Sequence, residues 1–176
     1  MVCRPDWFIS VRNRVSNRLT GLSAPRKGIG PTVIAVLITA CFAIAVYPAM
    51  PDGLTGWDPI QFALGLKHFD MAHHQPHPPG YLGHMALAWL CDRLGADAGS
   101  SVRMASLLAG AGMVFGTFVL GRRLFGDAAG IVAALLAASH PLTAYSALSG
   151  ESYSIEALGA VTLLLVGLRV TRSSGA

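Results

Sequence analysis

Long apolar segments alternate with short polar ones along most of this chain. Four of the apolar segments reach or approach the length of a membrane helix, and they cover residues 29–47, 102–120, 128–148 and 155–170. As an α-helix the first would be about 28 Å long, enough to cross the hydrocarbon core of a bilayer. The pattern predicts an all-α integral membrane protein with about four transmembrane helices.

A fifth apolar segment, Gly80 to Cys91, is shorter. It holds about a dozen residues before Asp92-Arg93, which favours a juxtamembrane or re-entrant helix over a span. A fifth span over about residues 80–94 is the alternative. With four spans, Arg122-Arg123 lies on the same side of the membrane as the basic N-terminal region, as the positive-inside rule expects. We therefore favour four spans, with a large outer loop at residues 51–100.

The N-terminal region sets the expected orientation. Residues 1–28 carry one acid, Asp6, against the basic residues Arg4, Arg12, Arg14, Arg18, Arg26 and Lys27. This excess predicts a basic cytoplasmic tail. A cleaved signal peptide is the competing interpretation, but the long tail and the Tyr47-Pro48-Ala49-Met50-Pro51 exit favour an uncleaved anchor. Residues 171–176 form a second short tail.

Two local motifs refine the spans. His140-Pro141 lies inside the third span, and proline in a helix interior predicts a kink there. The second span contains Gly112 and Gly116 in a small-xxx-small pattern, which allows close helix approach. We expect packing within a helix bundle rather than dimerisation.

Composition narrows the functional classes. Of the 176 residues, 53% are hydrophobic and only 12% are charged, whereas soluble domains carry about 25% charged residues. The net charge of +4 comes from basic flanks of apolar segments, without the basic face that nucleic-acid binding requires. Cys3, Cys41 and Cys91 are widely separated, which predicts neither a disulfide framework nor a zinc ribbon.

The outer loop concentrates the titratable residues. Asp58 follows the first span by about ten residues, where a carboxylate could act as a general base at the bilayer surface. Alternatively, Asp58-Pro59 starts a helix over Ile60 to Leu66. The loop also holds imidazole and carboxylate groups of the kind that bind metal ions, namely His68, Asp70, His73, His74 and His77. Their irregular spacing favours solvated histidines over a metal site.

Other polar residues lie near the expected outer ends of the spans. His77-Pro78-Pro79-Gly80 is a rigid hinge that presents His77 to a phosphate or to Asp58, or merely ends the loop. The planar guanidinium of Arg103 suits bidentate contact with phosphate oxygens. Alternatively, the side chain extends to the membrane interface to keep its charge in water. Glu151 falls on the same side as Asp58 under four spans, although it could instead cap the last helix. Glu156, one turn further, is a weaker candidate.

The order of these motifs resembles the N-terminal part of the C-type glycosyltransferase superfamily. That superfamily includes the protein O-mannosyltransferases, the lipid A aminoarabinose transferases and the bacterial RgtA/B/C/D-like transferases. The resemblance covers about residues 30–170. It is carried by Trp57-Asp58, His77-Pro78-Pro79-Gly80-Tyr81, Val102-Arg103, Gly121-Arg122-Arg123-Leu124-Phe125-Gly126 and Gly150-Glu151-Ser152-Tyr153. Proline follows Asp58 where the superfamily often has a second acid or a serine, which counts against a paired-acid metal site.

The resemblance implies a membrane glycosyltransferase that moves a sugar from a polyprenyl-phosphate donor to an acceptor on the extracytoplasmic side. It implies catalytic roles for Asp58 and Glu151 and substrate binding by His77, Arg103 and Tyr81. It leaves open a divalent metal ion, which Asp58, Glu151 and His77 would hold. The expected setting is a bacterial inner membrane, with membrane lipid and further membrane helices as neighbours and no nucleic acid. Full-length members have more helices, so we expect a fragment or truncated product.

Two other functions remain. The chain could be a non-catalytic membrane subunit or accessory module whose loop binds a lipid or a protein partner. A histidine-lined metal transporter would need polar residues inside several spans. The candidates in the spans are few, among them Thr117, Ser139, His140 and Thr143.

Overall fold

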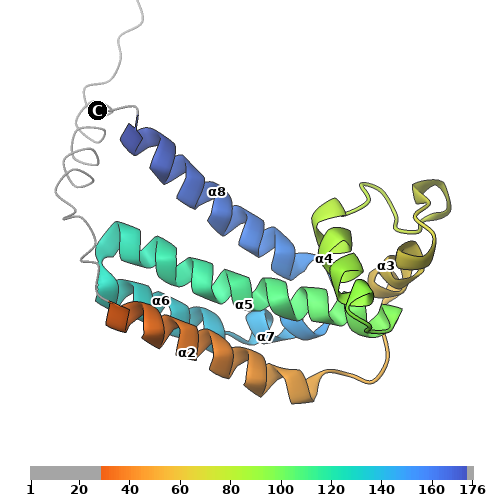
Figure 1. Cartoon of the computed structure of the whole chain (residues 1–176), viewed down its shortest axis with the longest axis horizontal. Coiled ribbons are helices and arrows are strands. Elements are labelled where there is room, and N and C mark those ends of the chain that lie inside the picture. Colours follow the sequence, from red (N-terminus) through yellow and green to blue (C-terminus); the bar gives the residue numbers. More distant parts are fainter. Residues whose placement is uncertain (1–28, 174–176) are drawn as a thin grey trace, which may run out of the picture.

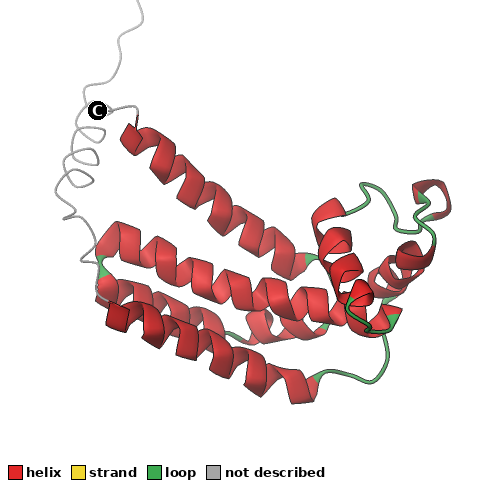
Figure 2. Cartoon of the chain, viewed as in Figure 1, coloured by secondary structure: helices red, strands yellow, loops and turns green. Residues whose placement is uncertain are grey.

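The computed structural model describes residues 29–173, and this part of the chain is built of helices and connecting loops without a β-strand (Figure 2). The predicted all-α fold is confirmed. Residues 1–28 and 174–176, which include the predicted basic tail, lie outside the described range. The α-helices are α2 (Ile29–Val46), α3 (Trp57–Lys67), α4 (Leu82–Arg93), α5 (Ala98–Phe125), α6 (Asp127–Ser139), α7 (Pro141–Leu148) and α8 (Tyr153–Ser173). Two short 3-10 helices, η1 (Tyr47–Ala49) and η2 (Met71–His73), interrupt the loops.

Three helical segments are long and apolar enough to cross a membrane: Ile29–Ala49, Ala98–Phe125 and Tyr153–Thr171. The helices α6 and α7 form a bent pair that would make a fourth span. Most large apolar side chains of α2, α6 and α8 are exposed in the described chain, as expected for surfaces that face lipid or further helices, whereas α5 is more buried. The predicted number of about four spans is therefore confirmed. The helix α4 has only 12 residues and is not among them.

The bend between α6 and α7 occurs at His140-Pro141, where the kink was predicted, and it measures 60°. His140 adopts an extended backbone and caps α7, because its Nδ1 accepts a hydrogen bond from the Leu142 amide at 3.2 Å. Pro141 occupies the first helical position, where its missing N–H costs nothing. The proline therefore starts a new helix after the break.

The long helix α5 lies at the centre and packs against every other α-helix of the described range (Figure 1). One buried cluster joins α5 to α2, α6 and α7, and includes Phe42, Val114 and Phe118. A second cluster, with Phe62, Met85 and Val102, joins α3 and α4 to the N-terminal part of α5. The helices α3 and α4 are thereby held at one end of the bundle, where the connection from α7 to α8 also lies.

Small residues let α5 approach its neighbours. A Cβ added at Gly112 would lie 3.2 Å from Leu158, and one at Gly116 would lie 3.0 Å from Val161. Both glycines therefore face α8, so the small-xxx-small pattern serves packing within the bundle. At the opposite end from α3 and α4, Arg122 pairs with Asp127 at 2.6 Å and donates to Thr32 at 2.9 Å. These contacts fasten the α5–α6 turn to α2.

Candidate active site

Four residues that the sequence singles out come together near α3 and α4: Asp58, His77, Tyr81 and Glu151. They belong to three segments that are far apart in the chain, namely the first turn of α3, the hinge before α4 and the turn between α7 and α8. All three segments pack around the buried cluster of Phe62 and Val102. The packing of α3 and α4 on α5 thus creates the site.

Asp58 lies in the first turn of α3, because the helix begins at Trp57 and not at Ile60 as expected. Gly56 precedes it with a φ of 107°, a conformation suited to glycine, and Pro59 is tolerated because first-turn amides need no helical acceptor. The Asp58 side chain is 36% exposed. A carboxylate in a helix's first turn is also favoured by the helix dipole. Asp58 is thus both helix-stabilising and accessible to a substrate.

His77 lies beside Asp58, with 3.8 Å between His77 Nδ1 and Asp58 Oδ1. Its ring stacks on Phe62 at a centroid distance of 6.0 Å and contacts Tyr81 at 5.0 Å. The Gly80 amide donates to the His77 carbonyl at 2.9 Å and closes the hinge. The hinge therefore presents the imidazole to Asp58, while Tyr81 contributes its ring as a wall.

Glu151 is held next to the start of α3 by its backbone. Its carbonyl accepts a hydrogen bond from Ser106 Oγ at 2.8 Å, and its amide donates to Ser149 Oγ at 3.2 Å. A Cβ added at Gly56 would lie 3.5 Å from Glu151 Oε1, so this carboxylate lies against the residue two positions before Asp58. Two carboxylates from separate segments therefore share one site.

The shared site changes the acidity of Glu151. Partial burial, and then the negative charge of Asp58, raise the pKa of Glu151 to about 6. The group therefore holds a proton up to mildly acidic pH and is largely ionised at pH 7. A displaced carboxyl pKa beside a second carboxylate is typical of a site that handles protons.

Arg103 belongs to a different cavity. Its guanidinium is buried and donates to the Pro51 carbonyl at 2.5 Å and to Ser100 Oγ at 3.2 Å. It lines a cavity of about 570 Å³ together with Asp52 and Asp97. Only its aliphatic stem approaches the site, since a Cβ added at Gly150 would lie 3.5 Å from Arg103 Cγ. The guanidinium thus holds the loop after the first span, and its phosphate-binding role stays a prediction.

Two of the other loop histidines, His68 and His73, form a separate cluster with Asp70. Its carboxylate contacts His73 Nδ1 at 2.6 Å and His68 Nε2 at 3.9 Å, and it accepts hydrogen bonds from the Ala72 and His73 amides. The hydrogen bond from the His73 side chain lowers the pKa of Asp70. Across residues 29–173, no group of three or more His, Cys, Asp or Glu side chains has an arrangement suited to a metal ion.

Sequence reasoning missed His84. It lies on α4, is only 1% exposed, and its ring is 4.9 Å from that of Phe62. Its position relative to Tyr81, Ala88 and Cys91 follows helical spacing, so it falls on the buried face of α4. A polar residue on that face was the available signal.

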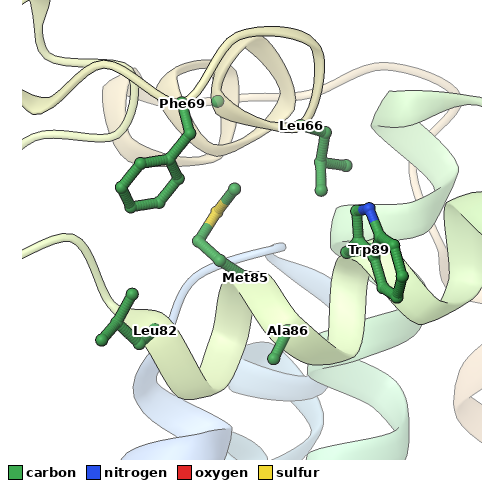
Figure 3. Close-up of a pocket in the computed structure, with 7 residues that line it drawn as sticks. Leu66, Phe69, Leu82, Met85, Ala86 and Trp89 are labelled. Atoms are coloured by element: carbon green, nitrogen blue, oxygen red, sulfur yellow. The ribbon is translucent and has the colours of Figure 1, made fainter.

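An apolar groove runs between α3 and α4 next to this site (Figure 3). Its volume is about 450 Å³, and it is lined by Gly65, Leu66, Phe69, Leu82, Met85, Ala86 and Trp89. Leu82 directly follows Tyr81, so the groove begins one residue from the site along α4. Arg93 lies over the Trp89 ring at 4.6 Å, which places a cation at the other end.

These features define a class: a helical integral membrane protein with a pair of carboxylates and a histidine at one end of its bundle. Comparison with protein families identifies the family. Residues 76–174 match the dolichyl-phosphate-mannose-protein mannosyltransferase family, and the chain belongs to it. The matched range includes His77, Tyr81, Arg103 and Glu151, whereas Asp58 precedes it. No curated protein and no solved structure matches the chain.

Proposed function

We propose that this chain forms the donor-side part of a membrane glycosyltransferase that uses a polyprenyl-phosphate sugar. The observation that carries the proposal is the meeting of Asp58 with Glu151 at one end of the bundle, beside His77. Family membership supports a lipid-linked donor and makes mannose the first sugar to test. The setting we propose is the inner membrane of a bacterium.

In this proposal Asp58 accepts the proton of the attacking hydroxyl group. A bond forms between the acceptor oxygen and the anomeric carbon, and the bond from that carbon to the phosphate oxygen breaks. Polyprenyl phosphate leaves with the electron pair, and the configuration at the anomeric carbon inverts. A positioned base of this kind contributes about 10²–10⁴-fold to a rate.

His77 and Glu151 would both support that step beside Asp58. The His77 imidazole, 3.8 Å from Asp58, orients the carboxylate and, when protonated, supplies positive charge toward the phosphate. Glu151 is ionised at neutral pH and accepts a hydrogen bond from a sugar or acceptor hydroxyl. Across the described residues these three side chains are not arranged to hold a metal ion, so no step of the proposal uses one.

The groove between α3 and α4 offers an apolar wall for the first units of the donor's hydrocarbon tail. The tail lies in the bilayer before it binds, so the groove stabilises it by van der Waals packing and not by removal from water. A donor whose prenyl chain is too short to fill the groove should therefore show a higher KM with little change in kcat.

The direct test is sugar transfer by membranes that contain the full-length protein. With tritiated polyprenyl-phosphate mannose, label should move to an acceptor fraction, and membranes without the protein should not transfer it. The same membranes with glucose and aminoarabinose donors identify the preferred sugar. Transfer from none of these donors would contradict the proposal and favour a non-catalytic subunit.

The proposed orientation places the site outside the cytosol. We expect a membrane-impermeant maleimide to label a cysteine at Ala72, in the loop after α3, and not one at Ala128, beside the α5–α6 turn. Both positions are exposed in the described chain, and the native cysteines are replaced beforehand. Permeabilised cells supply the control, because both positions should then react. Equal labelling in intact cells would contradict this topology.

A further inference from the structure

Arg103 is a buried arginine whose charged group is bound inside the protein. Only 7% of the residue is exposed. Its Nη1 donates to the Pro51 carbonyl at 2.5 Å and its Nη2 donates to Ser100 Oγ at 3.2 Å, while Nε has no hydrogen-bond partner. Neither acceptor carries a charge that would offset the burial of the guanidinium, which is costly. An apolar side chain would be the simpler choice for stability alone, which points to a role for the contact with Pro51.

The contact with Pro51 attaches the loop that leads to Asp58. Residues 50–56 connect the end of the first span to α3, and Asp58 lies in the first turn of that helix. Leu54 makes a second attachment, since a Cβ added at Gly99 would lie 3.6 Å from Leu54 Cγ. Gly99 and Arg103 are one helical turn apart and so lie on the same face of α5. The loop before α3 is therefore fixed to the N-terminal part of α5 at two points.

The aliphatic stem of Arg103 lies against the turn that carries Glu151. A Cβ added at Gly150, whose φ is 76°, would lie 3.5 Å from Arg103 Cγ and 3.3 Å from both Val102 and Pro59. Gly150 directly precedes Glu151. One side chain therefore contacts both segments that carry the carboxylates, with its guanidinium on the first and its stem on the second.

We propose that Arg103 is a positioning residue, which holds the loop before α3 against the Gly150 turn and so sets the distance between Asp58 and Glu151. The proposal rests on the proposed function for its purpose, since it assigns a support to the same carboxylate pair. Its test does not need transfer, because the position of the loop can be measured without a donor. Binding of the donor phosphate by Arg103 would leave the loop unchanged in that state.

The test measures the position of the loop with two spin labels, on the cysteines of Thr55→Cys and Phe125→Cys. Both positions are exposed, and the native cysteines are replaced beforehand. The helix α5 between them has 28 residues and is about 40 Å long, a distance that double electron–electron resonance measures. In the full-length protein, in nanodiscs without donor, the distance distribution should be single and narrow. Arg103→Ala should broaden it at least about twofold, because the guanidinium no longer holds the loop.

Three further measurements separate positioning from general loosening. Arg103→Met keeps an apolar stem beside Gly150 but lacks the guanidinium, so it should broaden the distribution too, and it decides the question if Arg103→Ala does not fold. Arg169→Ala, near the far end of α8, is the matched control and should keep the wild-type width. Added guanidinium ion should narrow the distribution of Arg103→Ala, whereas ammonium should not, because only the planar ion presents two parallel donors. The cavity of about 570 Å³ beside Arg103 gives these ions access.

Transfer kinetics supply the second readout. Both Arg103 variants should lower kcat by about ten- to a hundredfold with the donor KM within about twofold, as expected when a base is displaced and binding is not. An unchanged distribution in both variants, the same broadening in Arg169→Ala, or an equal effect of the two ions would each overturn the proposal. A higher donor KM with an unchanged distribution would overturn it in favour of phosphate binding. Absence of transfer in the wild type would count against the proposed function alone, and the spin-label distances would still decide the role of Arg103.

Discussion

Asp58→Asn should lower the rate of sugar transfer by at least about a hundredfold, because the amide cannot accept the proton of the attacking hydroxyl group. Asparagine has nearly the same shape as aspartate and keeps one oxygen as a hydrogen-bond acceptor. The α3 helix and its contact with His77 should therefore survive. The measurement is initial transfer rate with the labelled donor, normalised to the amount of protein inserted in the membrane.

The Asp70→Asn variant is a matched control for this substitution. Asp70 is a second carboxylate in the same loop with a histidine partner, His73, at 2.6 Å, but its contacts are with loop residues rather than Glu151. Transfer by Asp70→Asn should stay within about threefold of wild type, well inside the smallest effect expected of a general base. If Asp58→Asn transferred sugar as fast as Asp70→Asn, Asp58 would have no role as the base.

Asp58→Asn should also lower the pKa of Glu151. With the charge at position 58 removed, that part of the increase in the Glu151 pKa is lost, while the larger part due to burial remains. Dicyclohexylcarbodiimide modifies protonated carboxyl groups. The pH at which half of Glu151 reacts with it should therefore move below 6 but not reach the ordinary value of 4.5. This shift would show that the two carboxylates interact, whatever the substrate is.

Much of the helical architecture could be predicted because membrane spans depend on local sequence. The length of an apolar segment is enough to locate α2, α5 and α8, and a single proline locates the break before α7. Boundaries were less accurate: α3 begins three residues before Ile60, since the Gly56 backbone and Pro59 permit an earlier start. Such differences depend on capping geometry, which apolar patterning does not contain.

The site was predictable to the extent that topology determines it. Counting spans placed Asp58 and Glu151 on one side of the membrane, and the structure brings them together at one end of the bundle. The partner of Arg103 could not be predicted, because the Pro51 carbonyl lies 52 positions away in a loop without pattern. His84 was overlooked because its burial depends on the packing of α4 against Phe62 of α3, which is a property of the packed structure.

Gly130→Ala should cause a clear loss of stability, because the added methyl group would meet backbone atoms of α5. The helices α5 and α6 cross at Gly121 and Gly130 with their backbones almost in contact. A Cβ at Gly130 would lie 2.7 Å from the Phe118 carbonyl oxygen and 3.0 Å from the Arg122 amide nitrogen. These are backbone atoms of a packed helix and cannot rotate away, so the two helices must separate. Overpacking of this kind costs about 1–3 kcal/mol.

The matched control is Gly159→Ala on α8, where an added Cβ meets no atom within 4 Å. Alanine at an open helical position should be neutral or stabilise by about 0.5–1 kcal/mol, because glycine loses more backbone freedom on folding. Thermal unfolding in detergent should therefore give a lower Tm for Gly130→Ala and an equal or higher Tm for Gly159→Ala. Equal Tm values would mean that α5 and α6 do not approach this closely.

The close approach of α5 and α6 lies at the opposite end of the bundle from Asp58. In folded Gly130→Ala, the midpoint of Glu151 modification should therefore stay near pH 6. This measurement separates loss of stability from damage to the site.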